Sequence, residues 1–393
     1  MRELANGERK QTTMKIGITC YPTYGGSGVV ATELGIELAA RGHEVHFISY
    51  SQPFRLAGRE SQIRFHEVSV TNYPLFEFPP YDLALATHMA EVAEYYDLDL
   101  LHVHYAIPHS VSALLARQML ARAGRHLPFV TTLHGTDITL VGSDPAYLPI
   151  TRYAIDESDG VTAISDYLRQ KTVETFGTTR EVAVITNFVN CDIYVRNPEK
   201  TEKLRAQYAS KDERLLVHLS NFRPVKRVRD VIEIFARVAR KMPARLLMVG
   251  DGPERSLAEG LAMKLKIYDR VHFLGKLDTV HELLPIADLM LMPSELESFG
   301  LAALEAMACE VPTIGTAVGG MPELIEHGVT GFLFPVGDVA AMSEAAIALL
   351  QNPASMRAMS KAARCVAQKT YCSSHVIPRY EQFYESVLRN SAR

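Results

Sequence analysis

The stretch Pro293-Ser294-Glu295-Leu296-Glu297-Ser298-Phe299-Gly300-Leu301-Ala302-Ala303-Leu304-Glu305-Ala306-Met307-Ala308 follows the apolar run Asp288–Met292. The pattern predicts a buried strand, a short polar loop and a helix, which is the repeating unit of a parallel α/β sheet. Glu297 lies in the loop before the helix, and Glu305 lies within the apolar helix itself. A carboxylate at position 305 needs a partner, because an unpaired buried charge is costly.

The same alternation of apolar runs and helical patterns extends along the rest of the chain. Val29–Arg41 predicts an early helix, and Ile377–Leu388 has helical spacing at the other end. Continuous rather than alternating hydrophobicity indicates strands that are buried on both faces. The predicted strands are Lys15–Cys20, Glu44–Ser49, Leu100–Val103, Phe129–Leu133, Val161–Ile164 and Val182–Ile185, followed by Leu215–Leu219, Arg245–Val249, Val271–Leu274, Asp288–Met292 and Pro312–Gly315.

A polar segment separates these two series of strands. Residues Cys191 to about Leu204 carry several charges and contain Pro198, a composition typical of a linker. The predicted fold class is therefore α/β, with two Rossmann-like, doubly wound domains that face each other across a cleft. The predicted boundaries are a lead-in at 1–13, domains at 14–195 and 196–370, and a C-terminal helical segment at 371–393.

The composition is that of a soluble globular protein rather than a nucleic-acid-binding or membrane-spanning one. The 393 residues are 47% hydrophobic, and the net charge of -4 provides no electrostatic footprint for DNA or RNA. No apolar stretch reaches the roughly 18 residues of a membrane span. The five cysteines form no C-x-x-C pair, and the polar segment Met1–Thr13 lacks the apolar core of a secretion signal. We predict a cytoplasmic protein with reduced thiols, a disordered lead-in and Met14 as the natural start.

Two loops at predicted strand ends have the chemistry of anion sites. In doubly wound sheets, ligands bind beyond the carboxyl ends of the strands. The loop Tyr21-Pro22-Thr23-Tyr24-Gly25-Gly26-Ser27-Gly28 follows the first strand, and its glycines allow a phosphate to approach a helix start. It does not match G-x-G-x-x-G, and a tight turn that requires glycine is the alternative reading. In Ser220-Asn221-Phe222-Arg223-Pro224-Val225-Lys226-Arg227, Arg223 and Lys226 can grip a diphosphate, with a solvated basic loop as the alternative.

Two further patterns raise the question of a metal. Asp97-Leu98-Asp99 has the D-x-D form, but it precedes a strand and so lies at the edge remote from ligands. His102, His104, His109 and His134 offer enough imidazole for zinc, yet His102 and His104 lie on one face at the strand period. Hydrogen-bonded core histidines are the better interpretation, and we predict no metal and no cofactor.

The E-x7-E segment with its following Ala-Met-Ala, the basic loop and the Gly25–Gly28 loop together resemble the retaining GT-B glycosyltransferases. The similarity covers nearly the whole chain from Met14, with the motifs in the expected order. Arg223 and Lys226 are three positions apart, where many members have four. Within that superfamily, three longer strings resemble the N-acetylglucosaminyl-L-malate synthase family of bacillithiol biosynthesis: His102–His109, Val130–Thr139 and Ile185–Asn190.

The resemblance implies a reaction and an assignment of the two domains. It implies transfer of N-acetylglucosamine from UDP-N-acetylglucosamine to the hydroxyl of L-malate, giving the α-glycoside and UDP with retained configuration. The N-terminal domain would bind the acceptor, and the C-terminal domain would bind the nucleotide sugar. The tail would cross back to the first domain, and relatives imply a homodimer or larger homo-oligomer.

The resemblance also implies roles for individual residues. Arg223 and Lys226 would neutralise the diphosphate with backbone groups of Gly26 and Ser27, and His134 would lie beside the reacting centre against the sugar 6-hydroxyl. Glu305 would hold the ribose. The remaining donor residues are Asn221, Glu297, Phe299, Gly300 and Leu301, and the acceptor residues are Ser27, Tyr105, Thr131, Arg152 and Asn187. Arg152 matches the arginine with which a related sugar–inositol-phosphate family binds its anionic acceptor, although a surface role is an equal alternative.

Retention of configuration ordinarily indicates a carboxylate nucleophile on the face opposite the leaving group. Asp137 is the nearest acid to His134 in these motifs, but no acid is a clear candidate. We favour attack on the same face, with a phosphate oxygen accepting the malate hydroxyl proton. The alternatives are a GT-B enzyme with another acceptor (an inositol phosphate or a polysaccharide), a UDP-sugar epimerase, against which the E-x7-E segment argues, and a non-enzymatic nucleotide-sugar sensor.

Overall fold

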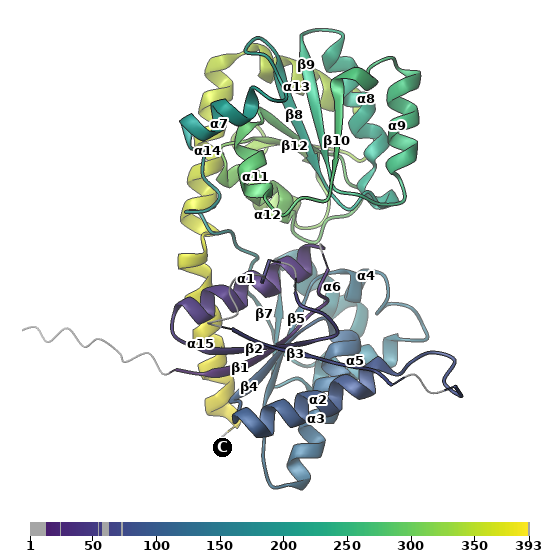
Figure 1. The fold of residues 1–393 in the computed structure, drawn as a ribbon, viewed down its shortest axis with the longest axis vertical. Coiled ribbons are helices and arrows are strands. Elements are labelled where there is room, and N and C mark those ends of the chain that lie inside the picture. The colour runs from purple at the N-terminus through teal and green to yellow at the C-terminus, as the bar shows by residue number, and fades with distance from the viewer. Residues whose placement is uncertain (1–12, 24, 54, 57–62, 72–73, 392–393) are drawn as a thin grey trace, which may run out of the picture.

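The computed structural model describes residues 13–391, apart from residues 24, 54, 57–62 and 72–73. Its two lobes are stacked along the long axis of the molecule, and each is built on one parallel sheet (Figure 1). We call the lobe that carries β1–β7 the N-terminal half and the lobe that carries β8–β13 the C-terminal half. The prediction of two doubly wound α/β units is confirmed.

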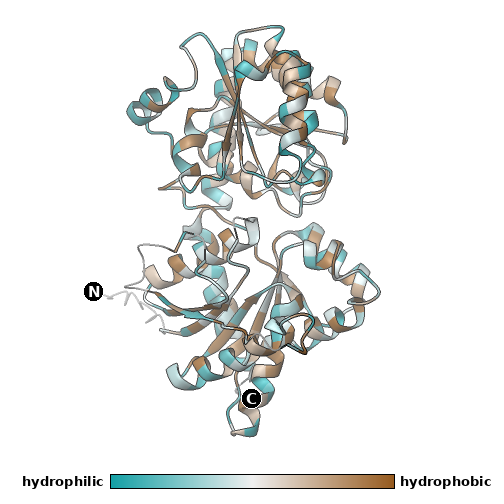
Figure 2. Ribbon diagram, turned by 45° about the vertical axis from the view of Figure 1, so that its right-hand side comes forward, coloured by the Kyte–Doolittle hydropathy of each residue, from teal (hydrophilic) through white to brown (hydrophobic). Residues whose placement is uncertain are grey.

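The N-terminal half contains a seven-stranded sheet in the order β3-β2-β1-β4-β5-β6-β7. Its strands are β1 (Lys15–Thr19), β2 (Glu44–Ser49), β3 (Ile63–Glu67), β4 (Leu100–His104), β5 (Phe129–Leu133), β6 (Gly160–Ala163) and β7 (Val182–Val184). Its helices are α1 (Gly26–Ala40), α2 (Tyr81–Tyr96), the short turn η1 (Ala106–Ser110), α3 (Val111–Arg122), α4 (Thr136–Thr139), α5 (Leu148–Glu157) and α6 (Asp166–Phe176). Figure 2 shows the apolar strands at the centre of this lobe, with mixed helices around them.

The C-terminal half contains a six-stranded sheet in the order β10-β9-β8-β11-β12-β13. Its strands are β8 (Arg214–Leu219), β9 (Ala244–Val249), β10 (Val271–Gly275), β11 (Leu289–Met292), β12 (Thr313–Thr316) and β13 (Gly331–Phe334). The helical elements after the first half are α7 (Pro198–Arg205), η2 (Pro224–Lys226), α8 (Val228–Ala239), α9 (Arg255–Lys264), η3 (Tyr268–Arg270), α10 (Val280–Leu283), η4 (Leu284–Ile286), α11 (Leu301–Ala308), α12 (Met321–Leu324), α13 (Val339–Gln351), α14 (Pro353–Thr370) and α15 (Ser373–Ser391). Among the described residues, no helix has both the length and the apolar composition needed to cross a bilayer.

The structure differs from the sequence-based expectation at two edge strands and in the linker. β3 and β13 were not expected, because β3 (IRFHE) alternates apolar and polar residues and β13 (GFLF) is a short run that begins at a glycine, so neither has the continuous apolar pattern. Part of the expected linker is helix α7, which begins at Pro198. The side chain of Asn197 caps it by accepting a hydrogen bond from the Lys200 backbone, and proline at the first helical position favours the helix.

The chain crosses between the halves twice, and the two crossing segments lie side by side. The first segment follows β7, and the second leads from α14 into α15. Helix α14 lies along the C-terminal half, and α15 continues down the N-terminal half (Figure 1). At their junction the backbone of Val189 accepts from Ser373 and donates to Tyr371, each at 2.9 Å. Farther along α15, the Tyr384 hydroxyl contacts His102 Nδ1 at 2.7 Å within the core of the first sheet. The C-terminal helix therefore belongs structurally to the N-terminal half.

Candidate active site

The strand orders place one switch point in each sheet. In the N-terminal half, β1 lies between β2 and β4, and in the C-terminal half β8 lies between β9 and β11. At such a point the connections leave in opposite directions, and a crevice opens beyond the carboxyl ends of the strands. The loops after β1 and β4 and those after β8 and β11 are the loops that carry the sequence motifs. Topology therefore brings motifs from distant parts of the chain to one place.

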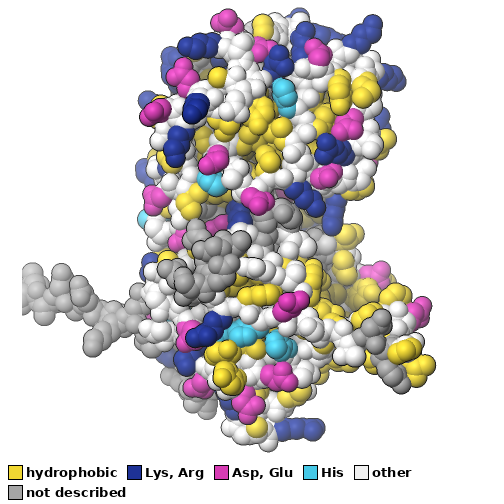
Figure 3. All heavy atoms as spheres, viewed as in Figure 1, with side chains coloured by type: hydrophobic (Ala, Val, Ile, Leu, Met, Phe, Trp, Pro, Cys, Tyr) yellow, Lys and Arg dark blue, Asp and Glu magenta, His cyan; other side chains and the backbone are white. Residues whose placement is uncertain are grey.

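A cavity of about 490 Å³ lies between the halves at these loops. We call it the inter-lobe cavity. Its walls include Gly25, Gly26 and Arg55 from the N-terminal half and Asn221, Arg223, Lys226, Glu297, Leu301 and Glu305 from the C-terminal half. The face shown in Figure 3 has basic and acidic side chains interspersed, so it presents no continuous surface of one charge.

The basic loop and the E-x7-E loop meet directly. Lys226 Nζ lies 2.5 Å from Glu297 Oε1, and the backbone of Glu295 donates to the carbonyl of Val225 at 2.8 Å. The two loops follow neighbouring strands, β8 and β11, which accounts for the contact. Arg223 is exposed on the same loop. The pair orients the lysine ammonium at the cavity wall, where it can meet an anion.

Two helix starts complete the positive character of the cavity. Helix α1 begins at Gly26 and α11 at Leu301, and both residues line the cavity. Neither helix has a capping side chain or an acidic residue in its first turn. The first backbone N–H groups of a helix lack partners within it and favour an anion. The cavity is therefore suited to a phosphate-containing ligand.

Glu305 is buried in α11 and has partners from outside its own helix. Its Oε1 accepts a hydrogen bond from the Tyr194 hydroxyl at 2.6 Å and lies 3.6 Å from Arg55 Nη2. Burial raises the pKa of Glu305, whereas Arg55 and the Tyr194 hydrogen bond lower it. The buried acid thus has two partners, Tyr194 and Arg55, and neither was predicted from the sequence.

A group of rings and hydroxyls lies on the N-terminal side, next to the residues that line the inter-lobe cavity. The Tyr105 hydroxyl interacts with Ser27 and Thr136, and its ring lies 5.5 Å from that of His134. Arg223 of the C-terminal half is close enough to influence the pKa of Tyr105, although burial dominates and raises it. Ser27, at the start of α1, is therefore brought together with Tyr105, His134 and Arg223 from three loops.

His134 belongs to a group of buried, neutral imidazoles. His104 Nδ1 lies 2.8 Å from His134 Nε2, and His102 is hydrogen-bonded at both ring nitrogens, as predicted for a core histidine. Burial lowers the pKa of His102 and His134 to about 3 and that of His109 to about 4. At neutral pH these rings act as hydrogen-bonding groups rather than as charges.

Replacing His109 by asparagine tests this burial. A histidine whose folded pKa lies below its unfolded value of about 6.5 makes the unfolded state bind more protons, so stability is lost as the pH falls through that window. His109→Asn retains a donor for the His104 carbonyl, which His109 Nδ1 contacts at 2.5 Å. Denaturant unfolding should show that the variant loses less stability than the wild type between pH 6.5 and 4, by up to about 1.4 kcal/mol per pH unit. His126→Asn, at an exposed site, should follow the wild type; parallel curves for His109→Asn would contradict the burial argument.

Asp137 is occupied by backbone donors. Its carboxylate accepts from the N–H groups of Ala106, His134 and Gly135 at 3.1, 3.2 and 2.9 Å. Burial raises its pKa to about 6, while those hydrogen bonds oppose the rise. The residue joins the loops after β4 and β5, which explains why an acid is buried there.

The halves touch next to His134. Gly135 has φ of +122°, and a Cβ there would lie 1.8 Å from Ser298 Oγ of the opposite half. The Ser165 hydroxyl donates to the Ser298 carbonyl at 2.7 Å. Glu323 of α12 accepts from the first backbone groups of α6, Asp166 at 2.9 Å and Tyr167 at 2.8 Å. These contacts fix the position of the Glu297 loop relative to His134.

Ser27, Tyr105 and His134 do not line the inter-lobe cavity, and several other predicted residues also lie outside its wall. Thr131 is fully buried in β5, where its hydroxyl is shared with Ser110 and Ser158. Phe299 is buried against the ring of Tyr371. Asn187 is buried, and Gly300 caps α11 with φ of +94°. Arg152 is half-exposed on α5, with Asp156 at 3.6 Å.

The D-x-D segment is engaged in structural contacts at the opposite sheet edge. Asp99 accepts from the Lys15 backbone at 2.7 Å, and Asp97 lies 3.2 Å from Arg125. Within the described part of the chain, no group of three or more His, Cys, Asp or Glu side chains is arranged to hold a metal ion.

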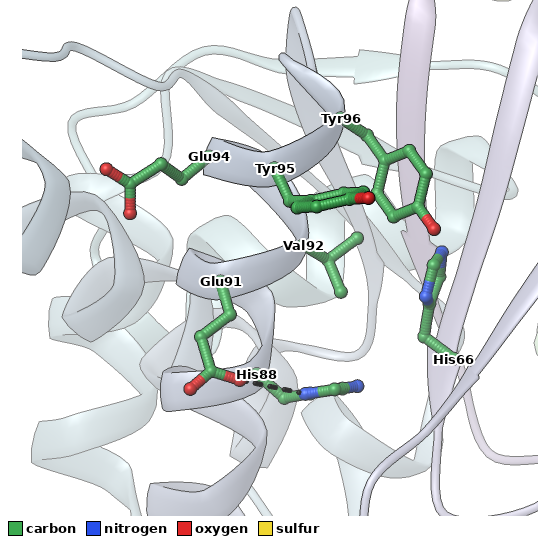
Figure 4. A pocket seen from close by; sticks show the side chains of 7 residues that line it. All are labelled: His66, His88, Glu91, Val92, Glu94, Tyr95 and Tyr96. Carbon is green, nitrogen blue, oxygen red and sulfur yellow. Dashed lines mark hydrogen bonds and ion pairs between the residues drawn. The ribbon is translucent and has the colours of Figure 1, made fainter.

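A second cavity of about 470 Å³ lies between edge strand β3 and helix α2. Figure 4 shows its side chains, with His88 and Glu91 joined at 3.2 Å and His66 facing Tyr96. Burial is the main cause that lowers the pKa of His66 to about 4. None of the predicted site residues lines this cavity.

The chain resembles known glycosyltransferases along nearly its whole length. Residues 24–193 match the family model Glycosyltransferase Family 4, and residues 200–366 match Glycosyl transferases group 1. The N-acetyl-alpha-D-glucosaminyl L-malate synthase of Bacillus anthracis is 50% identical over 377 residues, which cover 96% of this chain and 98% of that protein. The D-inositol 3-phosphate glycosyltransferase of Mycobacterium avium is 29% identical over 93% of this chain and 90% of its own length.

Solved structures share the fold. Anabaena HepE in complex with UDP and glucose superposes with a TM-score of 0.80 at 21% identity, covering 95% of this chain and all of that chain. The sucrose-phosphate synthase of Thermosynechococcus elongatus has a TM-score of 0.77 at 22% identity, covering 96% of this chain.

Proposed function

Because the chain belongs to the N-acetyl-alpha-D-glucosaminyl L-malate synthase family of GT-B glycosyltransferases, we propose that it transfers N-acetylglucosamine from UDP-N-acetylglucosamine to L-malate. The proposed products are N-acetyl-alpha-D-glucosaminyl L-malate and UDP. The observation that carries the donor side is the inter-lobe cavity, where Lys226, Arg223 and two uncapped helix starts converge. HepE, a protein of the same fold, binds UDP and glucose.

In the proposed reaction the diphosphate leaves toward the cations. The bond between the anomeric carbon and the β-phosphate oxygen breaks, and the malate hydroxyl oxygen bonds to that carbon on the same face. The hydroxyl proton passes to a phosphate oxygen of the leaving UDP. Lys226, Arg223 and the N–H groups at the start of α1 stabilise the negative charge as it develops, which lowers the barrier because they are fixed beforehand.

The contacts of Asp137 and Glu297 support attack by malate on the same face of the sugar as the leaving diphosphate. Both carboxylate oxygens of Asp137 face backbone donors, and Glu297 is held by Lys226. To attack the sugar from the opposite face, either acid would first have to leave these partners. His134, neutral and held by His104, is available to contact a sugar hydroxyl.

The proposed acceptor site is the group of rings and hydroxyls next to His134 on the N-terminal side. Ser27 and Tyr105 present hydroxyls there, and Arg223 adds a positive charge from the opposite half. Arg152, on α5, is proposed to contribute to binding of the malate carboxylates. Arg152→Ala should then raise the KM for malate several-fold more than the KM for the donor, whereas equal changes would remove Arg152 from the acceptor site.

An assay of UDP release tests the proposal. Purified protein with UDP-N-acetylglucosamine should release UDP rapidly on addition of L-malate and only slowly without it. D-malate and an inositol phosphate serve as acceptor controls. Release that depends on inositol phosphate but not on L-malate would contradict the acceptor assignment, and no release with any acceptor would contradict the enzyme proposal.

A further inference from the structure

Arg55 reaches from the N-terminal half to an acid of the C-terminal half. It lies in the segment between β2 and β3, and its guanidinium extends into the wall of the inter-lobe cavity. Nη1 lies 3.2 Å from Glu33 Oε1 on α1, and Nη2 lies 3.6 Å from Glu305 Oε1 on α11. Its side chain is 14% exposed and that of Glu305 is 7% exposed, so solvent screens the pair only weakly.

The acid is thus held by partners that the C-terminal half does not supply. Tyr194, whose hydroxyl donates to Glu305, lies in the segment that connects the halves, after β7. Burial keeps this phenol protonated, because it raises the Tyr194 pKa well above its ordinary value. Both contacts engage Oε1, and Glu305 itself lines the inter-lobe cavity.

We propose that Arg55 is a positioning residue that holds and orients the Glu305 side chain, so that the N-terminal half completes the ribose site of the donor. This inference rests on the proposed function, in which Glu305 accepts hydrogen bonds from the ribose. It makes recognition of the ribose dependent on the approach of the two halves. The donor would then bind tightly only when the N-terminal half, which carries the proposed acceptor site, lies against the C-terminal half.

The charges around Glu305 are consistent with this role. Glu33 repels the Glu305 carboxylate and raises its pKa, as burial does, and Arg55 is the charged side chain that opposes both effects. Without Arg55, Glu305 would still face Glu33 and would keep its hydrogen bond from the Tyr194 hydroxyl. A neutral acid accepts hydrogen bonds from sugar hydroxyls less strongly than a carboxylate does.

Isothermal titration of the full chain with UDP, 2′-deoxy-UDP and 3′-deoxy-UDP tests the proposal. A hydrogen bond to a charged group is worth a factor of roughly 10 or more in affinity. We expect the wild type to bind UDP about ten-fold more tightly than at least one deoxy analogue. In Arg55→Gln, UDP affinity should fall by about that factor while affinity for that analogue changes little, so the preference disappears. Arg55→Lys, which keeps the charge, should restore part of it.

Arg64→Gln is the matched control. Arg64 lies on β3 of the same half. Its side chain is 58% exposed and pairs with Glu44, away from the inter-lobe cavity. It should keep the wild-type preference for UDP. A purely structural effect of Arg55→Gln would weaken UDP and both analogues by the same factor and would overturn the inference, as would a preference that stays at the wild-type value. A wild type that does not bind UDP contradicts the proposed function itself, and one that binds UDP without a preference contradicts the ribose role on which the inference depends.

Discussion

Lys226→Ala is expected to lower kcat for transfer from UDP-N-acetylglucosamine to L-malate by about 10²–10³-fold, the usual effect of removing one fixed group that stabilises developing charge. Two losses combine in this variant. The ammonium no longer meets the departing diphosphate, and Glu297, which lies 2.5 Å from Lys226 Nζ, loses its partner in a buried position. Steady-state rates of UDP release, measured at saturating donor and malate, give the comparison.

Lys264→Ala is the matched control for that variant. Lys264 is an exposed lysine on α9 of the same half, so its removal changes the net charge equally without touching the cavity. It should retain wild-type kcat. A Lys226→Ala protein that is folded by circular dichroism and retains kcat within about five-fold would show that the diphosphate is stabilised elsewhere.

Gly135→Ala is expected to reduce kcat/KM by about 10²-fold, the scale of a misplacement of about 1 Å at a reacting centre. Position 135 has φ of +122°, and an added Cβ would lie 1.8 Å from Ser298 Oγ. To relieve that clash the Glu297 loop must move away from His134, or the halves must separate. The loss should therefore appear in rates measured at low concentrations of both substrates.

A matched glycine separates backbone strain from the contact between halves. Gly124 also has a positive φ, +80°, but a Cβ there meets nothing within 4 Å. Gly124→Ala should cost about 1–3 kcal/mol of stability at most and leave kcat/KM unchanged. Ser298→Gly in the Gly135→Ala background removes the clashing side chain and should restore much of the rate. If the double variant is as slow as Gly135→Ala, the contact at Ser298 is not the cause.

Local sequence patterns were sufficient to predict most of the fold. Strands buried on both faces, such as β9 and β11, are nearly continuous apolar runs, and their order along the chain indicates a doubly wound sheet. β3 and β13 lack that signal because β3 alternates apolar and polar residues and β13 is a short run that begins at a glycine. Helix α7 was not predicted because its segment is charged and has no apolar periodicity. Asn197 and Pro198 are the signals that mark its start.

Sequence patterns predict only those site residues whose motifs lie at the ends of predicted strands. Lys226 and Glu297 carry that signal in their own loops, and adjacent strands bring them together. Arg55 and Tyr194 do not, because their link to Glu305 exists only once the two halves and the connecting segment are assembled. The His104–His134 pair likewise depends on the register of β4 against β5. Such long-range partners leave no periodicity or spacing in a single sequence.

Transfer to L-malate with retained configuration can be followed through the anomeric proton of the product. The purified chain, UDP-N-acetylglucosamine and L-malate can be followed by ¹H NMR in one tube as UDP accumulates. We expect a new α-anomeric signal that grows in step with UDP and belongs to a malate glycoside. A β-anomeric product, or UDP accumulation with free N-acetylglucosamine and unchanged malate, would contradict it.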